Sequence, residues 1–376
     1  MNTKNWLNAE VDDIYDAQHA HYKCLTSNNA NMQKLFLKLP SMLYDSDKCT
    51  QDIKIEKQLL TGKHVLSSTI QVFPFLIVDR DNMPISRCLM TYYENDPNAY
   101  VGFFESYDDT EAVQKMFSYV ERKAKRDGKL AIVGPVDASF FINYRFKINL
   151  FDATPYTGEP YNREYYRLLW EESGFSTIDT FHSYSLCKIG EIDADNPLKK
   201  AFDSCVNNGC EFRSPDVGEF DICLNDMYNL LVETNLLSCG NRIPSEDQFM
   251  TMFAQLEEII DYDMIKLAYQ GNKLLAFSVA VPNYHTLVKK EHGLFKSRKV
   301  RQIRTNPKDY VLWHVCSWND RDLTAAILFS ILNELRENKC TAIGAMVKDV
   351  GIVDEVYKYL RRGSSYYYVL MTKQIH

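Results

Sequence analysis

The chain lacks any hydrophobic run long enough to cross a bilayer. Its longest apolar runs, such as residues 73–78, have the length of a strand, and residues 1–5 lack the basic-then-apolar order of a secretory signal. Positive charge is also scarce, because 43 Lys and Arg residues face 50 Asp and Glu residues, for a net charge of −7. That balance disfavours nucleic acid or an anionic membrane as a global partner. The sequence therefore predicts a soluble, cytoplasmic protein without a membrane partner.

Several common catalytic and metal-binding patterns are missing as well. The ten cysteines include no Cys-x-x-Cys pair, and the eight histidines form no His-x-x-x-His set that would complete a zinc site. No Gly-x-Ser-x-Gly elbow, Walker loop or His-Glu-x-x-His helix is present. We therefore expect reduced thiols in the core, no metal, and a chemistry outside these classes.

What the chain does contain is an internal repeat. Residues 309–350 repeat the plan of residues 98–137: an apolar strand that ends at a serine, Ser106 or Ser317, then an acidic turn, a long amphipathic helix and a second apolar strand. A repeat of this length indicates a duplicated α/β domain, and 376 residues suffice for two. The polar stretch 190–197 is the expected boundary, which gives domains 1–190 and 191–376.

Hydrophobic periodicity predicts the same order of elements in each half. The first forty residues are expected to be helical up to a break at Pro40. We then expect strands at 70–78, 85–93, 99–105 and 129–136 with a helix at 109–126, and strands at 263–269, 274–281, 310–317 and 341–347 with helices at 224–237, 245–260 and 321–337. The predicted fold class is α/β in the layered α+β sense. Each domain has a mixed, mostly antiparallel sheet flanked by helices, in which only the last pair is parallel.

A late motif in the first half resembles a known family. Asn162 and the pair Tyr165-Tyr166 stand ahead of Gly174-Phe175 and a final strand, as in the GNAT acyltransferases. The Pro40-x-x-x-Tyr44 spacing and the Gly134-Pro135 step are similar to those of uncharacterised bacterial two-domain GNAT-like proteins. The resemblance implies two tandem GNAT-like domains and transfer of an acyl group from acyl-CoA to an amine.

In that family the amides of a glycine-rich turn before the central helix hold the pyrophosphate of CoA. The first copy of this turn has Asp108, Asp109 and Glu111 and no glycine, so we expect a helix cap there. The second copy keeps the Arg and the final Ala, and it is the expected cofactor site or, alternatively, an ordinary helix start. Its residues are Ser317, Arg321, Asp322, Leu323, Thr324, Ala325 and Ala326.

A basic run precedes the second copy and would suit a 3′-phosphate or an acidic substrate, although a solvated hairpin with charged edges is the favoured explanation. It contains Lys289, Lys290, Lys296, Arg298, Lys299, Arg301, Arg304 and Lys308.

The resemblance also implies a general base and a tyrosine acid. By position, Tyr165, Tyr166 and Tyr357 are candidate acids, and Glu105 and His314 are candidate bases. The structural alternative is core packing for the tyrosines, a strand-end charge for Glu105 and a hydrogen-bonded histidine inside a strand for His314.

The predicted function is N-acyl transfer, with acetyl-CoA or another acyl-CoA in the second domain. The acceptor, a small-molecule or peptide amine, is expected in the cleft between the domains. One alternative is a catalytically inactive GNAT-fold binding protein, which the acidic turn and Thr324 favour. Another is a Fem-type aminoacyl transferase, which the net charge disfavours and the basic run favours.

Overall fold

The computed structural model describes residues 21–186, 195–234, 243–287, 298–318, 320–349, 353 and 363–376. The chain divides into two compact units. The N-terminal unit comprises Met1–Phe151, Pro160–Ile178 and Val369–His376, and the C-terminal unit comprises Asp152–Glu159 and Asp179–Tyr368. The predicted boundary falls largely in residues 187–194, outside the described residues, so a division at residue 190 stays a prediction.

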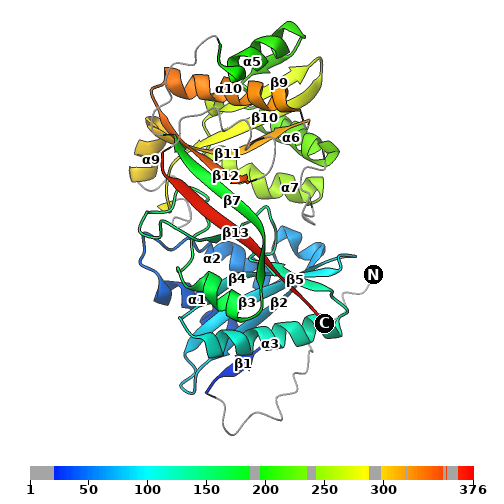
Figure 1. Cartoon of the computed structure of the whole chain (residues 1–376), viewed down its shortest axis with the longest axis vertical. Helices are drawn as coiled ribbons and strands as arrows, with labels where there is room; N and C mark the ends of the chain where they lie inside the picture. Colours follow the sequence, from blue (N-terminus) through cyan, green and yellow to red (C-terminus); the bar gives the residue numbers. More distant parts are fainter. Residues whose placement is uncertain are drawn as a thin grey trace. The chain divides into compact units, whose positions relative to one another are not determined.

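From β2 to β5 the N-terminal unit follows the predicted order of elements (Figure 1). The prediction of helix throughout the first forty residues is wrong for residues 23–25, which form a strand. Its strands pair in the order β1-β2-β3-β4-β5-β13, antiparallel except for the parallel pair β4–β5. The elements of this part of the chain are β1 (Lys23–Leu25), α1 (Ala30–Leu43), α2 (Ile53–Leu60), η1 (Val65–Ser68), β2 (Ile70–Val78), β3 (Pro84–Tyr93), β4 (Asn98–Ser106), α3 (Thr110–Arg126), β5 (Ala131–Gly134), β6 (Phe146–Lys147), α4 (Tyr166–Glu172) and β7 (Ser176–Leu186).

The C-terminal unit repeats this plan, with strands in the order β7-β12-β11-β10-β9-β8 and one parallel pair, β11–β12. The remaining elements are α5 (Pro197–Asn207), β8 (Glu211–Arg213), α6 (Phe220–Thr234), α7 (Glu246–Phe253), η2 (Ala254–Glu258), η3 (Tyr262–Met264), β9 (Ile265–Gln270), β10 (Lys273–Pro282), α9 (Arg298–Thr305), β11 (Asp309–Ser317), α10 (Arg321–Glu337), β12 (Thr341–Lys348) and β13 (Ser365–Gln374). The predicted fold class, with its single parallel pair in each half, is confirmed.

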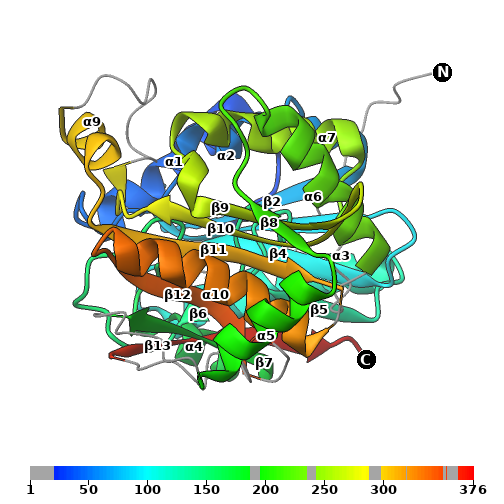
Figure 2. The same cartoon turned by 90° about the horizontal axis from the view of Figure 1, so that it is seen from above.

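Helices cover both faces of each sheet. In the N-terminal unit, Cys88 and Met90 of β3 join the core beneath α3, whereas Arg87, the residue before Cys88, bonds to α1 and α2 on the opposite face. This alternation follows from the two-residue period of a strand. In the C-terminal unit, α10 and α5 lie on one face of the strands, and α6 and α7 lie on the other (Figure 2).

The two units exchange their last strands. β7 follows the tyrosine motif of the N-terminal half, yet its final residues pair with β12, with Leu186 opposite Ala342. Conversely, the end of β13 pairs with β5, with Met371 opposite Gly134. Each unit therefore contains a strand segment from the other half of the sequence.

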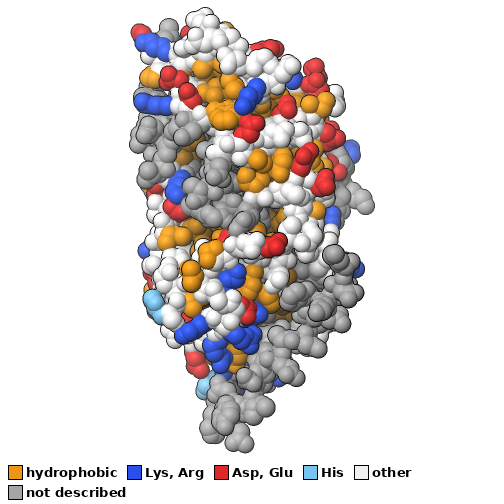
Figure 3. Space-filling model, turned by 90° about the vertical axis from the view of Figure 1, so that its right-hand side faces the viewer, with side chains coloured by type: hydrophobic (Ala, Val, Ile, Leu, Met, Phe, Trp, Pro, Cys, Tyr) orange, Lys and Arg blue, Asp and Glu red, His pale blue; other side chains and the backbone are white. Residues whose placement is uncertain are grey.

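Charge of both signs is interspersed with hydrophobic side chains on the face in Figure 3, where Lys and Arg side chains gather in the lower part of the view. Among the described residues, no helix is both long and apolar enough to span a membrane. In the same residues, no three His, Cys, Asp or Glu side chains converge as metal ligands would.

Candidate functional site

The site in the N-terminal unit begins with a proline inside a helix. Pro40 was predicted to end the first helix, but α1 continues through it to Leu43, so that prediction is wrong. Proline has no N–H, and the carbonyl of Phe36, four residues earlier, therefore loses its helical donor. Arg87 Nη1 replaces that donor at 2.7 Å. Pro40 thus leaves the Phe36 carbonyl free to accept a hydrogen bond from a side chain of the sheet.

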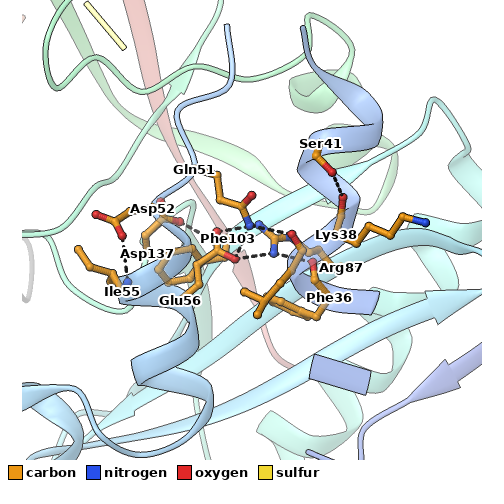
Figure 4. A network of polar contacts seen from close by, with 11 residues as sticks. Phe36, Lys38, Ser41, Gln51, Asp52, Ile55, Glu56, Arg87, Phe103 and Asp137 are labelled. Atoms are coloured by element: carbon orange, nitrogen blue, oxygen red, sulfur yellow. Dashed lines mark hydrogen bonds and ion pairs between the residues drawn. The ribbon is translucent and has the colours of Figure 1, made fainter. Parts of the chain in front are cut away.

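Arg87 also forms a buried ion pair with Glu56 of α2 (Figure 4). Its two terminal nitrogens donate to the two carboxylate oxygens at 2.7 and 2.9 Å, and Gln51 Nε2 donates to Glu56 at 2.9 Å. Arg87 is 1% exposed and Glu56 is 3% exposed. The bidentate geometry offsets the cost of removing both charges from water.

Glu105 lies directly opposite Arg87 on the neighbouring strand β4. Its carboxylate accepts a hydrogen bond from the Tyr166 hydroxyl at 2.8 Å, and the Tyr44 hydroxyl lies 3.3 Å from that of Tyr166. Burial raises the pKa of Glu105 to about 7, and the opposing effect of Arg87 is smaller. Because Arg87 is already paired with Glu56, Glu105 is held as a carboxyl group that exchanges its proton near neutral pH.

The two motif tyrosines both bind the end of β4. The Tyr166 hydroxyl accepts from the Ser106 N–H at 2.9 Å, and the Tyr165 hydroxyl donates to the Ser106 carbonyl at 2.9 Å. Tyr166 is fully buried, and burial raises its pKa well above the usual range. The structure therefore brings Tyr165 and Tyr166 together with Glu105, and the Tyr166 hydroxyl positions that carboxyl group.

In the N-terminal unit the chain itself fills the gap beside β4. The β4–β5 ladder joins Asn98–Tyr100 to Ala131–Val133, and β4 continues alone to Ser106. A Cβ on Gly102 would lie 2.0 Å from the Val136 carbonyl oxygen. Beyond it the Phe103 N–H donates to the Asp137 carboxylate (Figure 4). Beyond its ladder with β5, the backbone of β4 is therefore contacted by residues 136 and 137 of the chain itself.

The turn after β4 is a helix cap, as its acidic sequence predicted. The Asp109 carboxylate accepts from the Ala112 N–H at 2.9 Å and from the Tyr22 hydroxyl. Asp108 is exposed, and Glu111 lies in the first turn of α3. These carboxylates occupy the positive end of the helix dipole, where a pyrophosphate would have to bind.

The corresponding gap in the C-terminal unit is arranged differently. The parallel ladder ends where Leu312 faces Gly344, and β11 continues to Ser317. A register shift opposite Val279 and Ala280 places a bulge at Trp313, whose indole Nε1 donates to the Thr157 carbonyl at 2.8 Å. The next residue, His314, is exposed. The bulge therefore lies immediately before the candidate base, and β11 stays paired with β10 from His314 to Ser317.

The turn before α10 is capped from within. The Asp320 carboxylate accepts from the Leu323 N–H at 2.8 Å. The Thr324 hydroxyl, predicted to face a phosphate, donates to the Asp320 carbonyl at 2.7 Å and lies 2.6 Å from Ser317 Oγ. Arg321 and Asp322 are exposed, whereas Ser317, Leu323, Thr324, Ala325 and Ala326 are buried.

One candidate acid and part of the basic run lie outside the described residues: Tyr357, Lys289, Lys290 and Lys296. The rest of the basic run is described. Helix α9 contains Arg298, Lys299, Arg301 and Arg304, and Lys308 precedes β11.

Glu56 and Arg87 were not predicted as parts of a site, and Tyr44 was not predicted as the partner of Tyr166. One signal was available, since Arg87 interrupts an otherwise apolar strand, a position where arginine is rare unless it is paired.

Comparison with known proteins places these units in context. No known family profile matches the sequence. The chain is 25% identical over 285 residues to Protein YghO of Escherichia coli (strain K12), which covers 70% of this chain and 69% of that protein. A tandem GNAT protein from the clavulanic acid biosynthesis pathway, solved without acetyl-CoA, aligns with 94% of this chain and 99% of its own at 11% identity and a TM-score of 0.49.

A second solved structure matches more closely in shape. It is a GCN5-related glucosamine N-acetyltransferase region of a fungal multi-domain β-N-acetylglucosaminidase, which aligns with 95% of this chain and 38% of that chain at 9% identity and a TM-score of 0.53. At this identity the likeness concerns the fold alone. The chain has the GNAT fold, built twice in tandem.

Proposed function

We propose that the chain is an N-acyltransferase that moves an acyl group from acyl-CoA to an amine, with the acyl donor held by the C-terminal unit. The observation that carries this proposal is the contrast between the two gaps. The backbone of β4 contacts Val136 and Asp137, whereas β11 separates from β12 after Leu312, stays paired with β10 and carries the exposed His314. In the N-terminal unit the gap beside this strand is thus filled by the chain itself. In the C-terminal unit the equivalent strand carries an exposed candidate base.

The start of α10 supplies the anion-binding end of this proposed site. Helix N-termini attract phosphate through unpaired N–H groups and the helix dipole, and Arg321 adds a positive charge that is exposed in the first turn. The Asp320 cap takes one of those N–H groups, and Asp322 adds a negative charge. We therefore expect weaker phosphate binding than at a glycine-rich turn.

The chemistry requires one proton to leave and another to arrive. A bound acyl-CoA supplies the activated carbonyl carbon. As the amine nitrogen bonds to that carbon, the carbon–sulfur bond breaks, a base takes the proton from nitrogen, and an acid protonates the thiolate. His314 is the favoured base because it is exposed next to the bulge of β11. Glu105 and the tyrosines 165, 166 and 357 remain candidates from the family resemblance.

A binding protein without catalysis is the second candidate. Both helix starts are capped by a carboxylate, Asp109 or Asp320, and the Thr324 hydroxyl is engaged within its own turn. These contacts favour stable helix ends over phosphate binding.

Ligand-induced stabilisation tests the proposed donor site, and turnover then separates the enzyme from the binding protein. CoA and acetyl-CoA at about 100 times their dissociation constants stabilise the folded state by about 2.7 kcal/mol. That corresponds to a rise in melting temperature of roughly 5–10 °C for a unit of this size. Arg321→Glu should remove most of this rise. Arg336→Glu, at the other end of the same helix, is the matched control and should retain it.

A rise without turnover would favour the binding protein, so free thiol release from acetyl-CoA is measured with a panel of amines. No rise with any CoA species, or equal rises in the wild type and Arg321→Glu, would exclude the proposed donor site.

A further inference from the structure

The C-terminal unit contains an open pocket of about 320 Å³ with polar and apolar lining, here called the strand-start pocket. A pocket of this volume has room for several waters or one small metabolite. Its floor includes Asp309 and Thr341, the first residues of the parallel strands β11 and β12. The full set of lining residues is Thr154, Tyr156, Ser185, Asn283, His285, Asp309, Thr341, Ile343 and Tyr366.

One wall of the pocket is fixed by a buried chain of hydrogen bonds. The Tyr156 hydroxyl lies 2.8 Å from Ser183 Oγ and 3.0 Å from the Tyr368 hydroxyl, which donates to Glu159 at 2.7 Å. Tyr156 is 2% exposed and Glu159 is 1% exposed. A wall held by such a network is preformed, so a ligand would meet little cost of ordering it.

The Asp309 carboxylate is the first acceptor that the pocket offers. Asn283 Nδ2 donates to one oxygen at 2.7 Å, and Thr341 Oγ1 donates to the other at 2.7 Å. A carboxylate has about four lone-pair sites, so capacity for further donors remains on both oxygens. The two neutral partners fix its orientation without neutralising its charge.

His285 is the second acceptor. Its Nδ1 lies 3.2 Å from the Pro155 carbonyl oxygen, which can only accept, so Nδ1 carries the proton. In the neutral ring Nε2 is then an acceptor. The backbone of His285 lies in the left-handed region at φ 52°, which is an uncommon conformation for a residue other than glycine. The backbone N–H of His285 donates to Asn283 Oδ1 at 3.1 Å, which holds this histidine against another lining residue of the pocket.

The lining excludes one class of ligand. The described residues that line the pocket include no Lys or Arg, while Asp309 is negative, so a phosphate or carboxylate would meet repulsion. The half-buried Tyr366 ring, held edge to face against Tyr156 at a centroid distance of 5.9 Å, adds an apolar surface of the kind that packs against C–H groups. Thr154, Ser185 and Thr341 also line the pocket.

We propose that the strand-start pocket binds a small polyhydroxylated molecule without negative charge. Its hydroxyl groups donate to Asp309 and His285, and its carbon face packs against the Tyr366 ring. Strands rise about 3.3 Å per residue, so Asp309 and Ser317, at the two ends of β11, are roughly 25 Å apart. The pocket is therefore distinct from the proposed acyl-donor site, and its occupancy does not depend on acyl transfer.

Saturation-transfer NMR on the full chain tests this proposal with four probes: glucose, glucosamine, ethanolamine and glucose 6-phosphate. We expect transfer to glucose, glucosamine or both, and none to ethanolamine or the phosphate. Binding of glucosamine without glucose would mean that the natural ligand also carries an ammonium group. Asp309→Asn should weaken the dissociation constant at least fivefold, because the amide presents donors where the carboxylate presents acceptors.

Thr154→Val provides a second variant that does not disturb the core, since Thr154 is exposed, and it should weaken binding about threefold. Asp221→Asn, an exposed aspartate on α6, is the control and should bind like the wild type. Transfer to none of the probes, preferential binding of ethanolamine or glucose 6-phosphate, or unchanged affinity in both pocket variants would overturn the proposal.

Discussion

Arg87 Nη1 donates at 2.7 Å to the carbonyl of Phe36, the carbonyl that Pro40 leaves without a helical donor. The same guanidinium binds Glu56 with two hydrogen bonds and faces Glu105 across the β3–β4 ladder. A proline in one helix thus helps to hold a buried arginine whose charge influences a carboxyl group on another element. The order of this site arises from contacts between residues far apart in sequence.

Removing one member of the buried Arg87–Glu56 ion pair should lower the free energy of unfolding more than replacing both members with methionine. Arg87→Met leaves Glu56 buried without its partner, and Glu56→Met does the same to Arg87, so each should lower the free energy of unfolding by about 3–5 kcal/mol. The double variant should be more stable than either single variant, because no uncompensated charge remains. Urea denaturation measures all three.

The exposed pair Arg167–Glu171, at 2.8 Å, is the control for that comparison. Arg167→Met should cost less than about 0.5 kcal/mol, as exposed helix pairs do. A double variant less stable than both single variants would contradict the desolvation argument.

Glu105 should make stability depend on pH. Its pKa is about 7 in the folded state against 4.5 as the ordinary value, so the folded protein binds this proton more tightly. The resulting stabilisation is complete below about pH 4.5 and is lost as the pH rises through 7. A shift of this size corresponds to at most about 3 kcal/mol, and less for a side chain that is partly exposed.

Glu105→Gln isolates that contribution, because the amide is neutral at every pH and its oxygen still accepts from Tyr166. Relative to the wild type, the variant should gain roughly 1–3 kcal/mol between pH 4.5 and pH 8 in urea denaturation. Glu164→Gln, at an exposed position, is the control and should show little change. Parallel pH profiles for Glu105→Gln and the wild type would refute the raised pKa.

Local features of the fold were predictable from the sequence, because they depend on neighbouring residues. The bounds of β2 and α10 and the Asp109 cap agree with the predicted ones, since alternation, helical periodicity and capping act over a few residues. The pairing of Arg87 with Glu56, 31 residues away, was not predictable, because periodicity places a residue on a face without naming its partner. The exchange of β7 and β13 was missed for the same reason.

That exchange predicts how fragments behave. Residues 1–190 contain the N-terminal unit except for Val369–His376. Without that segment, β5 keeps β4 but loses its second partner strand, β13. The core also loses the buried side chains of Val369 and Met371, each worth about 1.5–3 kcal/mol. The fragment should therefore be largely unfolded, since a whole domain is stable by only about 5–15 kcal/mol.

A synthetic peptide of residues 365–376 should restore folding of that fragment, seen as a blue shift in the fluorescence of Trp170, which is fully buried in the unit's core. A peptide with Val369 and Met371 both replaced by Asp is the control and should have no effect. A fragment that folds cooperatively without any peptide would show that the exchanged strand is dispensable.

Gly102 should be the glycine least tolerant of substitution in the N-terminal unit. A Cβ there would lie 2.0 Å from the Val136 oxygen and 2.2 Å from its carbonyl carbon, and these backbone atoms cannot rotate away. Gly102→Ala should therefore cost at least 3 kcal/mol, on the order of the larger overpacking penalties. Gly128→Ala is the matched control: nothing lies within 4 Å of its Cβ, but its φ of +74° imposes strain of about 1–2 kcal/mol. Urea denaturation of both variants separates the cost of the steric contact from the cost of backbone strain. Equal losses in the free energy of unfolding would mean that residues 135–137 move aside readily and that the gap beside β4 can open to a ligand.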